Sequence, residues 1–158
     1  MATARDIYQA NLDAVTRALW TRDLELMLRH LAIPNMMLTA DREIVLSSAL
    51  EMEIAMNDFR DHLGRLGAQE YHRVCKDAVF LDKDRQTLAG RHVTYILREG
   101  EQIMAPYWND MTLLLIDGQW KGTRIESTAC NAAFPIICDD MARGQKSEIA
   151  SRTRAGKE

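Results

Sequence analysis

Five side chains in the second half of the sequence could act together on a small molecule. They are a histidine, a tyrosine, an asparagine, an arginine and a glutamate: His92, Tyr107, Asn109, Arg124 and Glu126. Glu126 or His92 could act as a general base, and Tyr107 or Arg124 could stabilise a developing oxyanion. The same residues could instead bind a ligand without catalysis. A structural salt bridge between Arg124 and Glu126 is the third interpretation.

A hairpin turn at Asp117-Gly118 determines which of these side chains share a face of the sheet. Counted without interruption, the register predicts the opposed pairs Leu115–Trp120, Leu113–Gly122, Met111–Arg124 and Asn109–Glu126. This face is apolar near the turn and polar further away, so we expect a core at one end and a pocket at the other. Arg124 is therefore expected to point inward and to grip a carboxylate or carbonyl oxygen, assisted by Tyr107 or Asn109.

The same register can be extended through a second turn at Glu99-Gly100. It places His92 on the inner face, opposite Tyr107. Pro106 has no amide proton to donate to a ladder, so the strand around it is less securely placed.

The opposite face of this hairpin has a mixed composition. Trp108, Leu114 and Ile125 supply apolar area there that the helices are not expected to cover. We therefore expect a homodimer that forms through this outer face.

The first third of the chain has the periodicity of helices. Apolar residues recur at helical spacing over 4–20, and Asp23 is placed to cap a second, short helix that stops before Pro34. A third and longest helix is expected over 48–66, with Ser48 as its N-cap.

Residues 36–46 and 69–128 have the composition of β-strands. A short strand pair is expected over 36–46, and four longer strands are expected over 70–81, 87–98, 102–116 and 119–128. Helices followed by closely linked antiparallel strands indicate an α+β domain.

The order of these elements, with the segment Met111–Lys121 and its Asp-Gly-x-Trp turn, resembles the nuclear transport factor 2-like (SnoaL-like) superfamily. The resemblance covers residues 4–128. It implies a cone-shaped fold in which N-terminal helices pack on a strongly curved antiparallel sheet with a mixed edge. It also implies a small-molecule pocket at the mouth of the cone, and many relatives dimerise through the outer sheet face.

The sequence departs from the catalytic patterns of that superfamily at two places. Met37-Leu38-Thr39 stands where ketosteroid isomerases have a carboxylate base, and Gly122, Arg124 and Glu126 stand where related enzymes have histidines. Two functions remain open. The first is a cofactor-independent lyase, isomerase or cyclase that acts on an apolar carbonyl or carboxylate compound. The second is a non-catalytic ligand-binding or dimerisation module.

The bulk composition bounds the remaining possibilities. The chain has 158 residues, 47% of them hydrophobic and 27% charged, and a formal charge of −3, which gives no electrostatic reason to expect a nucleic acid or membrane partner. We expect a cytoplasmic protein with its domain over 1–140 and a polar, disordered tail over 141–158. The cysteines and histidines lack the spacing of a metal site, so we expect neither a metal nor a cofactor.

Overall fold

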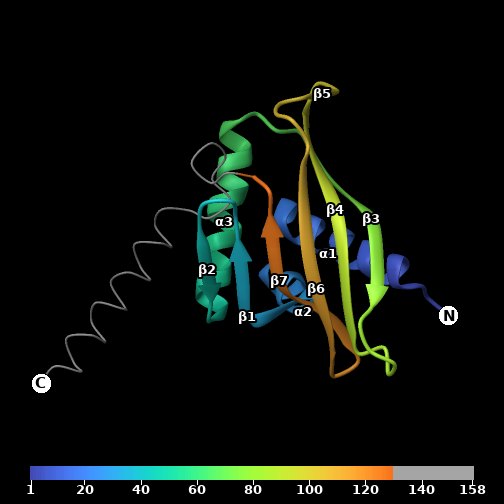
Figure 1. The fold of residues 1–158 in the computed structure, drawn as a ribbon. Helices are drawn as coiled ribbons and strands as arrows, with labels where there is room; N and C mark the ends of the chain where they lie inside the picture. Colours follow the sequence, from blue (N-terminus) through green and yellow to red (C-terminus); the bar gives the residue numbers. More distant parts are fainter. Residues whose placement is uncertain (130–158) are drawn as a thin grey trace, which may run out of the picture.

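The computed structural model describes residues 1–129, which form three helices and seven strands (Figure 1). In chain order these are α1 (Ala4–Thr21), α2 (Leu24–His30), β1 (Leu31–Leu38), β2 (Glu43–Leu46), α3 (Ala49–Arg65), β3 (Glu70–Phe80), β4 (Thr87–Arg98), β5 (Glu101–Gln102), β6 (Tyr107–Ile116) and β7 (Gln119–Ser127). The expected boundary between a domain over 1–140 and a tail over 141–158 lies outside the described residues. No helix within residues 1–129 has the length and apolar character needed to cross a membrane.

The helices begin at side chains that satisfy their free amide groups. The Asp23 carboxylate accepts a hydrogen bond from the Leu26 amide at 3.1 Å, and the Ser48 hydroxyl accepts one from the Glu51 amide at 3.1 Å. Both predicted caps are confirmed. The second helix ends earlier than expected, because the chain is already extended at Leu31 and continues as β1 through Pro34.

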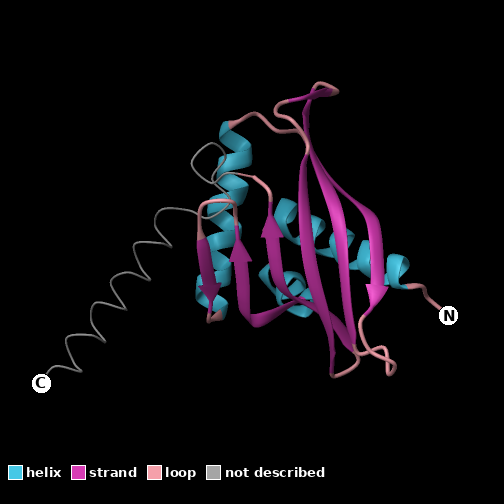
Figure 2. Ribbon diagram, in the orientation of Figure 1, coloured by secondary structure: helices cyan, strands magenta, loops and turns pink. Residues whose placement is uncertain are grey.

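The strands form one mixed sheet in the order β2-β1-β7-β6-β4-β3, with β5 paired to β4. The β1–β7 pair is parallel and the other pairs are antiparallel. All three helices lie on the same face of the sheet (Figure 2), which we call the inner face. The predicted α+β architecture, with helices before a bent sheet that has a mixed edge, is confirmed.

Both predicted hairpin turns have the backbone conformation that a two-residue loop requires. The φ angles are 51° and 79° at Glu99 and Gly100, and 50° and 79° at Asp117 and Gly118. Two successive positive φ angles are the mark of a type I′ turn, which matches the twist of antiparallel strands.

The strand predicted over 102–116 is interrupted at residues 103–106, which include Pro106. The interruption inserts two residues into the hairpin, so Thr94 lies opposite Tyr107 and His92 lies opposite Asn109. The predicted pairing of His92 with Tyr107 is wrong. The inner face predicted for His92 is nevertheless correct, because a shift of two residues keeps a side chain on the same side of a strand.

A β-bulge at Gly122 and Thr123 has a larger consequence. Leu113 pairs with Gly122 as predicted, but the next pair is Thr112 with Arg124, so β7 has one extra residue there. A shift of one residue exchanges the faces of every later position. The predicted pairs Met111–Arg124 and Asn109–Glu126 are therefore wrong, and Met111 pairs instead with Ile125.

The buried apolar side chains form two groups on the inner face. The first, which we call the packed cluster, lies under the first half of α1 and consists of Tyr8, Leu12, Cys75, Leu88, Met111 and Leu113. The second, which we call the pocket cluster, includes side chains of all three helices and extends to α3. Gly90 lets α1 approach the packed cluster, because a Cβ atom at this position would lie 2.4 Å from the Tyr8 ring.

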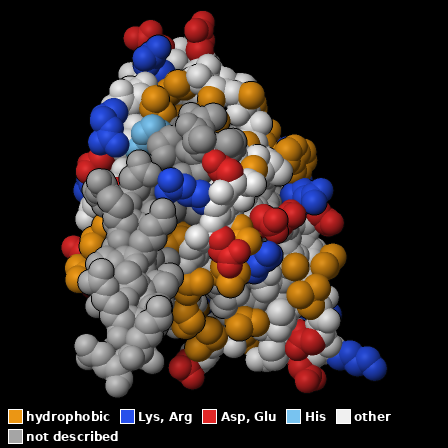
Figure 3. Space-filling model, turned by 60° about the vertical axis from the view of Figure 1, so that its left-hand side comes forward, with side chains coloured by type: hydrophobic (Ala, Val, Ile, Leu, Met, Phe, Trp, Pro, Cys, Tyr) orange, Lys and Arg blue, Asp and Glu red, His pale blue; other side chains and the backbone are white. Residues whose placement is uncertain are grey.

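Charged side chains of both signs are interspersed over the side of the molecule shown in Figure 3. Hydrophobic side chains lie between them, and no continuous basic surface is visible on this side. This distribution agrees with the formal charge of −3.

Candidate functional site

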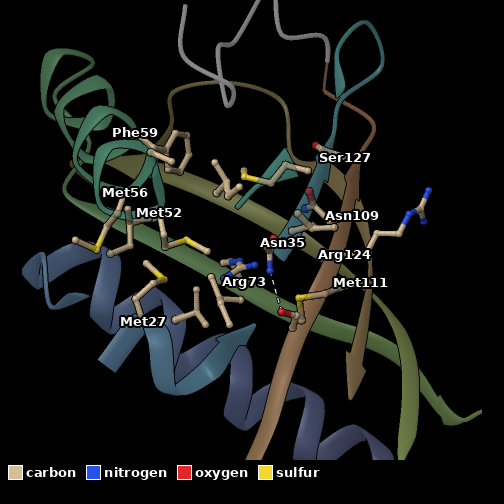
Figure 4. Close-up of a pocket in the computed structure, with 18 of the residues that line it drawn as sticks. Met27, Asn35, Met52, Met56, Phe59, Arg73, Asn109, Met111, Arg124 and Ser127 are labelled. Carbon is tan, nitrogen blue, oxygen red and sulfur yellow. Dashed lines mark hydrogen bonds between the residues drawn. The ribbon is translucent and has the colours of Figure 1, made fainter. Parts of the chain in front are cut away.

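A cavity of about 130 Å³ lies between the inner face of the sheet and α3 (Figure 4). Most of its wall is apolar, with Met52, Met56 and Phe59 contributed by α3 and Met27 by α2. A protein cavity of roughly 150 Å³ lined by apolar side chains accommodates benzene. The space is therefore comparable with a single ring or a short branched chain.

Arg73 brings a positive charge into this apolar space. It lies on β3 opposite Thr94, and its side chain points into the cavity from the sheet (Figure 4). Its Nε atom is buried and has no hydrogen-bond partner among residues 1–129. None of the ion pairs within the described part of the chain includes this guanidinium. The cavity thus contains a cation that receives no counter-charge from residues 1–129.

Four polar side chains line the cavity together with Arg73: Tyr71, Thr94, Tyr107 and Asn109. The Asn109 amide nitrogen donates a hydrogen bond to the Thr94 hydroxyl at 2.9 Å, and the Tyr107 side chain interacts with those of Thr94 and Tyr71. Burial is the main reason that the pKa of Tyr107 lies well above its usual value. Tyr107 is therefore a neutral phenol in the cavity wall.

Asn35 supplies a further polar group from β1. Its amide nitrogen donates to the backbone oxygen of Gly122 at 2.8 Å, and its side chain lies near Arg73 in the cavity (Figure 4). The contact uses the bulge in β7, where a Cβ atom at Gly122 would lie only 2.9 Å from the Leu31 side chain. Glycine at this position thus leaves room for the Leu31 side chain, which would otherwise have to move.

The residues predicted for the site fall into two groups. Tyr107 and Asn109 line the cavity from the inner face, as expected. Arg124 and Glu126 lie on the outer face, with 44% and 51% of their side chains exposed, and they pair with each other at 3.3 Å. The predicted inward orientation of these two side chains is wrong because of the bulge, and Figure 4 shows the Arg124 side chain directed away from the cavity.

His92 lies on the inner face but does not line the cavity. It is fully buried, its Nδ1 atom shares a hydrogen bond with the Tyr8 hydroxyl at 2.6 Å, and its Nε2 atom has no hydrogen-bond partner within residues 1–129. Burial, with a smaller contribution from the charge of Arg73, lowers the pKa of His92 to about 2. An imidazole of such low basicity is a poor proton acceptor, so His92 is unsuited to the role of general base. Its hydrogen bond with Tyr8 connects α1 to the sheet.

The sequence analysis missed Arg73, Tyr71 and Asn35, although two signals for them were present. Tyr71 and Arg73 alternate along a strand adjacent to the one that carries Thr94 and His92, so correct pairing of β3 with β4 would have placed them on the inner face. Gly122 inside a strand pattern is a known signal for a bulge, and it would have reversed the assignment of Arg124.

The chemical groups in the cavity wall favour binding of an anion. Within residues 1–129 the wall contains no aspartate, glutamate, histidine or cysteine. The described part of the chain also contains no group of three or more such residues placed to hold a metal ion. Cys75 is a free thiol buried in the packed cluster, and burial raises its pKa.

No family model and no curated protein matches the chain, but solved structures do. An NTF-2 like protein of unknown function from Shewanella oneidensis is 14% identical, with a TM-score of 0.60 over 78% of this chain and 98% of that one. An NTF2-like protein from Cytophaga hutchinsonii is 16% identical, with a TM-score of 0.55 over 82% and 100%. The chain has the nuclear transport factor 2-like fold. This confirms the fold that the sequence pattern predicted.

A third structure with the same arrangement covers more of the chain. It is a domain of unknown function with a cystatin-like fold from Nostoc punctiforme, which is 12% identical, with a TM-score of 0.61 over 98% of this chain and 99% of that one. At such low identity the nuclear transport factor 2-like fold is what these structures share with the protein. The function has to be argued from the cavity itself.

Proposed function

We propose that this nuclear transport factor 2-like domain binds a small, largely apolar carboxylic acid in the cavity between the sheet and α3. The observation that carries the proposal is the Arg73 guanidinium, which points into an apolar cavity without a counter-charge from residues 1–129. A carboxylate can accept two parallel hydrogen bonds from a guanidinium, and it would supply the missing charge.

The surroundings of Arg73 support this proposal. The residue is half-buried, and its Nε atom is shielded from solvent without a hydrogen-bond partner within residues 1–129. Withdrawal of a charged group from water carries a cost that an opposite charge offsets, so a bound anion should stabilise the folded protein. Apolar pockets with a few convergent polar groups are the usual form of small-molecule sites.

Binding without acid–base catalysis is the function that we favour. Besides Arg73, the titratable residues in the described lining are Tyr71, Tyr107 and Arg124, and burial raises the pKa of Tyr107. A lyase, isomerase or cyclase needs a group that accepts a proton near neutral pH. The described lining contains no carboxylate, histidine or cysteine that could supply one, so we propose a ligand-binding module.

A ligand screen with paired arginine variants tests this function. Small aromatic and aliphatic carboxylates, with benzoate as the reference, should raise the melting temperature of the wild-type protein. Arg73→Met should abolish this shift, whereas Arg124→Gln should retain it, because Arg124 borders the cavity but its side chain points away from it and pairs with Glu126. A shift that survives in Arg73→Met, or is lost in Arg124→Gln, would refute the proposal.

We also propose that two copies associate through the outer face of the sheet. Trp108 is 45% exposed there and Val74 is 38% exposed, and both lie opposite Val93 on the strand between them. Ile125, which was expected on this face, instead packs inside against the packed cluster. Light scattering should give twice the monomer mass for the wild type and the monomer mass for Trp108→Glu. A wild-type monomer at high concentration would contradict the proposal.

A further inference from the structure

The polar atoms in the cavity are of two complementary kinds. The Arg73 guanidinium is a hydrogen-bond donor, and the Tyr71 hydroxyl can also donate. Asn35 and Asn109 also line the cavity, and each uses its amide nitrogen on a protein partner. Each of these two amides therefore has a carbonyl oxygen to offer a ligand.

The orientation of the Asn35 amide follows from its partner. The Gly122 carbonyl oxygen can only accept a hydrogen bond, so the Asn35 group that contacts it at 2.8 Å must be the nitrogen. Asn35 is 4% exposed, and its amide oxygen accepts no hydrogen bond from residues 1–129. Figure 4 shows the side chain among those that surround the cavity, close to Arg73.

The Asn109 amide is oriented by its contact with Thr94. Its nitrogen donates a hydrogen bond to the Thr94 hydroxyl at 2.9 Å. Asn109 is 3% exposed, and its oxygen accepts no hydrogen bond within the described residues.

We propose that the ligand is a carboxylic acid that also carries a hydrogen-bond donor, a hydroxyl or N–H group, close to its acid group. This inference rests on the proposed function, because it assumes that the carboxylate pairs with Arg73. The donor of the ligand binds the amide oxygen of Asn35 or Asn109. The apolar remainder of the ligand lies against Phe59 and the methionines of α3.

The physical reason is the cost of a buried acceptor without a partner. In the free protein, water can satisfy the two amide oxygens, and a ligand without a donor displaces that water without replacing its hydrogen bonds. Such an unsatisfied group weakens binding by roughly tenfold to a hundredfold. Sites built to bind a hydroxyl or N–H group reject the analogue that lacks it for this reason.

Titration calorimetry with the full-length protein and four commercially available acids tests the inference. The probes are benzoate and its 2-, 3- and 4-hydroxy derivatives, which fit a cavity close to the size of a benzene ring and differ only in the position of the donor. We expect at least one hydroxybenzoate to bind the wild type tenfold or more tightly than benzoate. In Asn35→Leu or Asn109→Leu this preference should fall to less than threefold, while benzoate binds as well as before or better.

The outcomes separate this inference from the proposed function. Benzoate binding that depends on Arg73 and equals the binding of every hydroxybenzoate would support the function and overturn the inference. A preference that survives in both asparagine variants would also overturn it. Failure of all four acids to bind, or binding unaffected by Arg73→Met, would overturn both. The wild-type comparison needs no variant, so a loss of folding in Asn35→Leu leaves the test decisive.

Discussion

The two ends of the inner sheet face hold different kinds of polar group. Beside the packed cluster the groups are neutral: the Tyr8 hydroxyl and the His92 ring share a hydrogen bond at 2.6 Å, and the buried His92 Nε2 atom has no hydrogen-bond partner within residues 1–129. In the cavity, Arg73 carries a full charge and has no ion-pair partner within residues 1–129. The packed end therefore contributes stability, whereas the cavity end gives up stability in exchange for a group that can recognise a ligand.

The largest effect should come from truncation of an apolar side chain at the packed end. Leu88→Ala removes a side chain that is fully buried and should lower the free energy of unfolding by about 2–5 kcal/mol. Met56→Ala should cost less, because this side chain already borders open space. Urea denaturation followed by circular dichroism measures both. Equal losses would show that the two ends are packed alike.

The next effect is a dependence of stability on pH that originates at the packed end. His92 has a pKa of about 2 in the folded protein and about 6.5 when unfolded, so between these values only the unfolded chain binds the proton. Stability is therefore complete above about pH 6.5 and decreases as the pH falls below it, by up to roughly 1.4 kcal/mol per pH unit.

Comparison with a variant isolates the contribution of His92. Denaturation curves at pH 7.5 and 5.5 should show a clear loss for the wild type and a smaller loss for His92→Gln, since glutamine does not titrate in this range. The Gln side chain keeps an oxygen that can accept a hydrogen bond from Tyr8. The same loss in both proteins would mean that other groups cause the pH dependence.

A substitution in the cavity is expected to change the free energy of unfolding by a smaller amount and with the opposite sign. Arg73→Met replaces a half-buried charge with an apolar side chain in a largely apolar cavity, so the free protein should be as stable as the wild type or more stable by about 1 kcal/mol. Removal of a polar group at the packed end should instead lower the free energy of unfolding. A loss of more than about 2 kcal/mol in Arg73→Met would assign the arginine a structural role.

The smallest effect is expected on the outer face. Arg124→Gln removes one partner of an ion pair whose side chains are 44% and 51% exposed. Such surface pairs contribute about 0–1 kcal/mol, so stability should change by less than about 0.5 kcal/mol. A large loss of stability in thermal or urea denaturation would contradict the position that the bulge gives this residue.

Local features of the chain were predictable because short-range interactions decide them. Asp23 and Ser48 cap helices wherever the rest of the chain lies, and two-residue turns such as Asp117-Gly118 depend on the conformations open to those two residues. The order of helices and strands then indicated the fold that the solved structures share. The inner positions of Tyr107 and Asn109 were also predicted correctly, since no irregularity separates them from the turn along β6.

Only the tertiary structure decided which arginine enters the cavity. One extra residue in β7 reverses the faces of Arg124 and Glu126, and it arises where Gly122 admits Leu31 and the Asn35 amide from the neighbouring strand. Arg73 reaches the cavity through the pairing of β3 with β4, and the cavity exists because α3 stands away from the sheet while α1 lies directly on it. These contacts join residues far apart in the chain. Hydrophobic alternation along a single strand contains no information about them, because its period of two is kept until a neighbouring strand inserts or removes a residue.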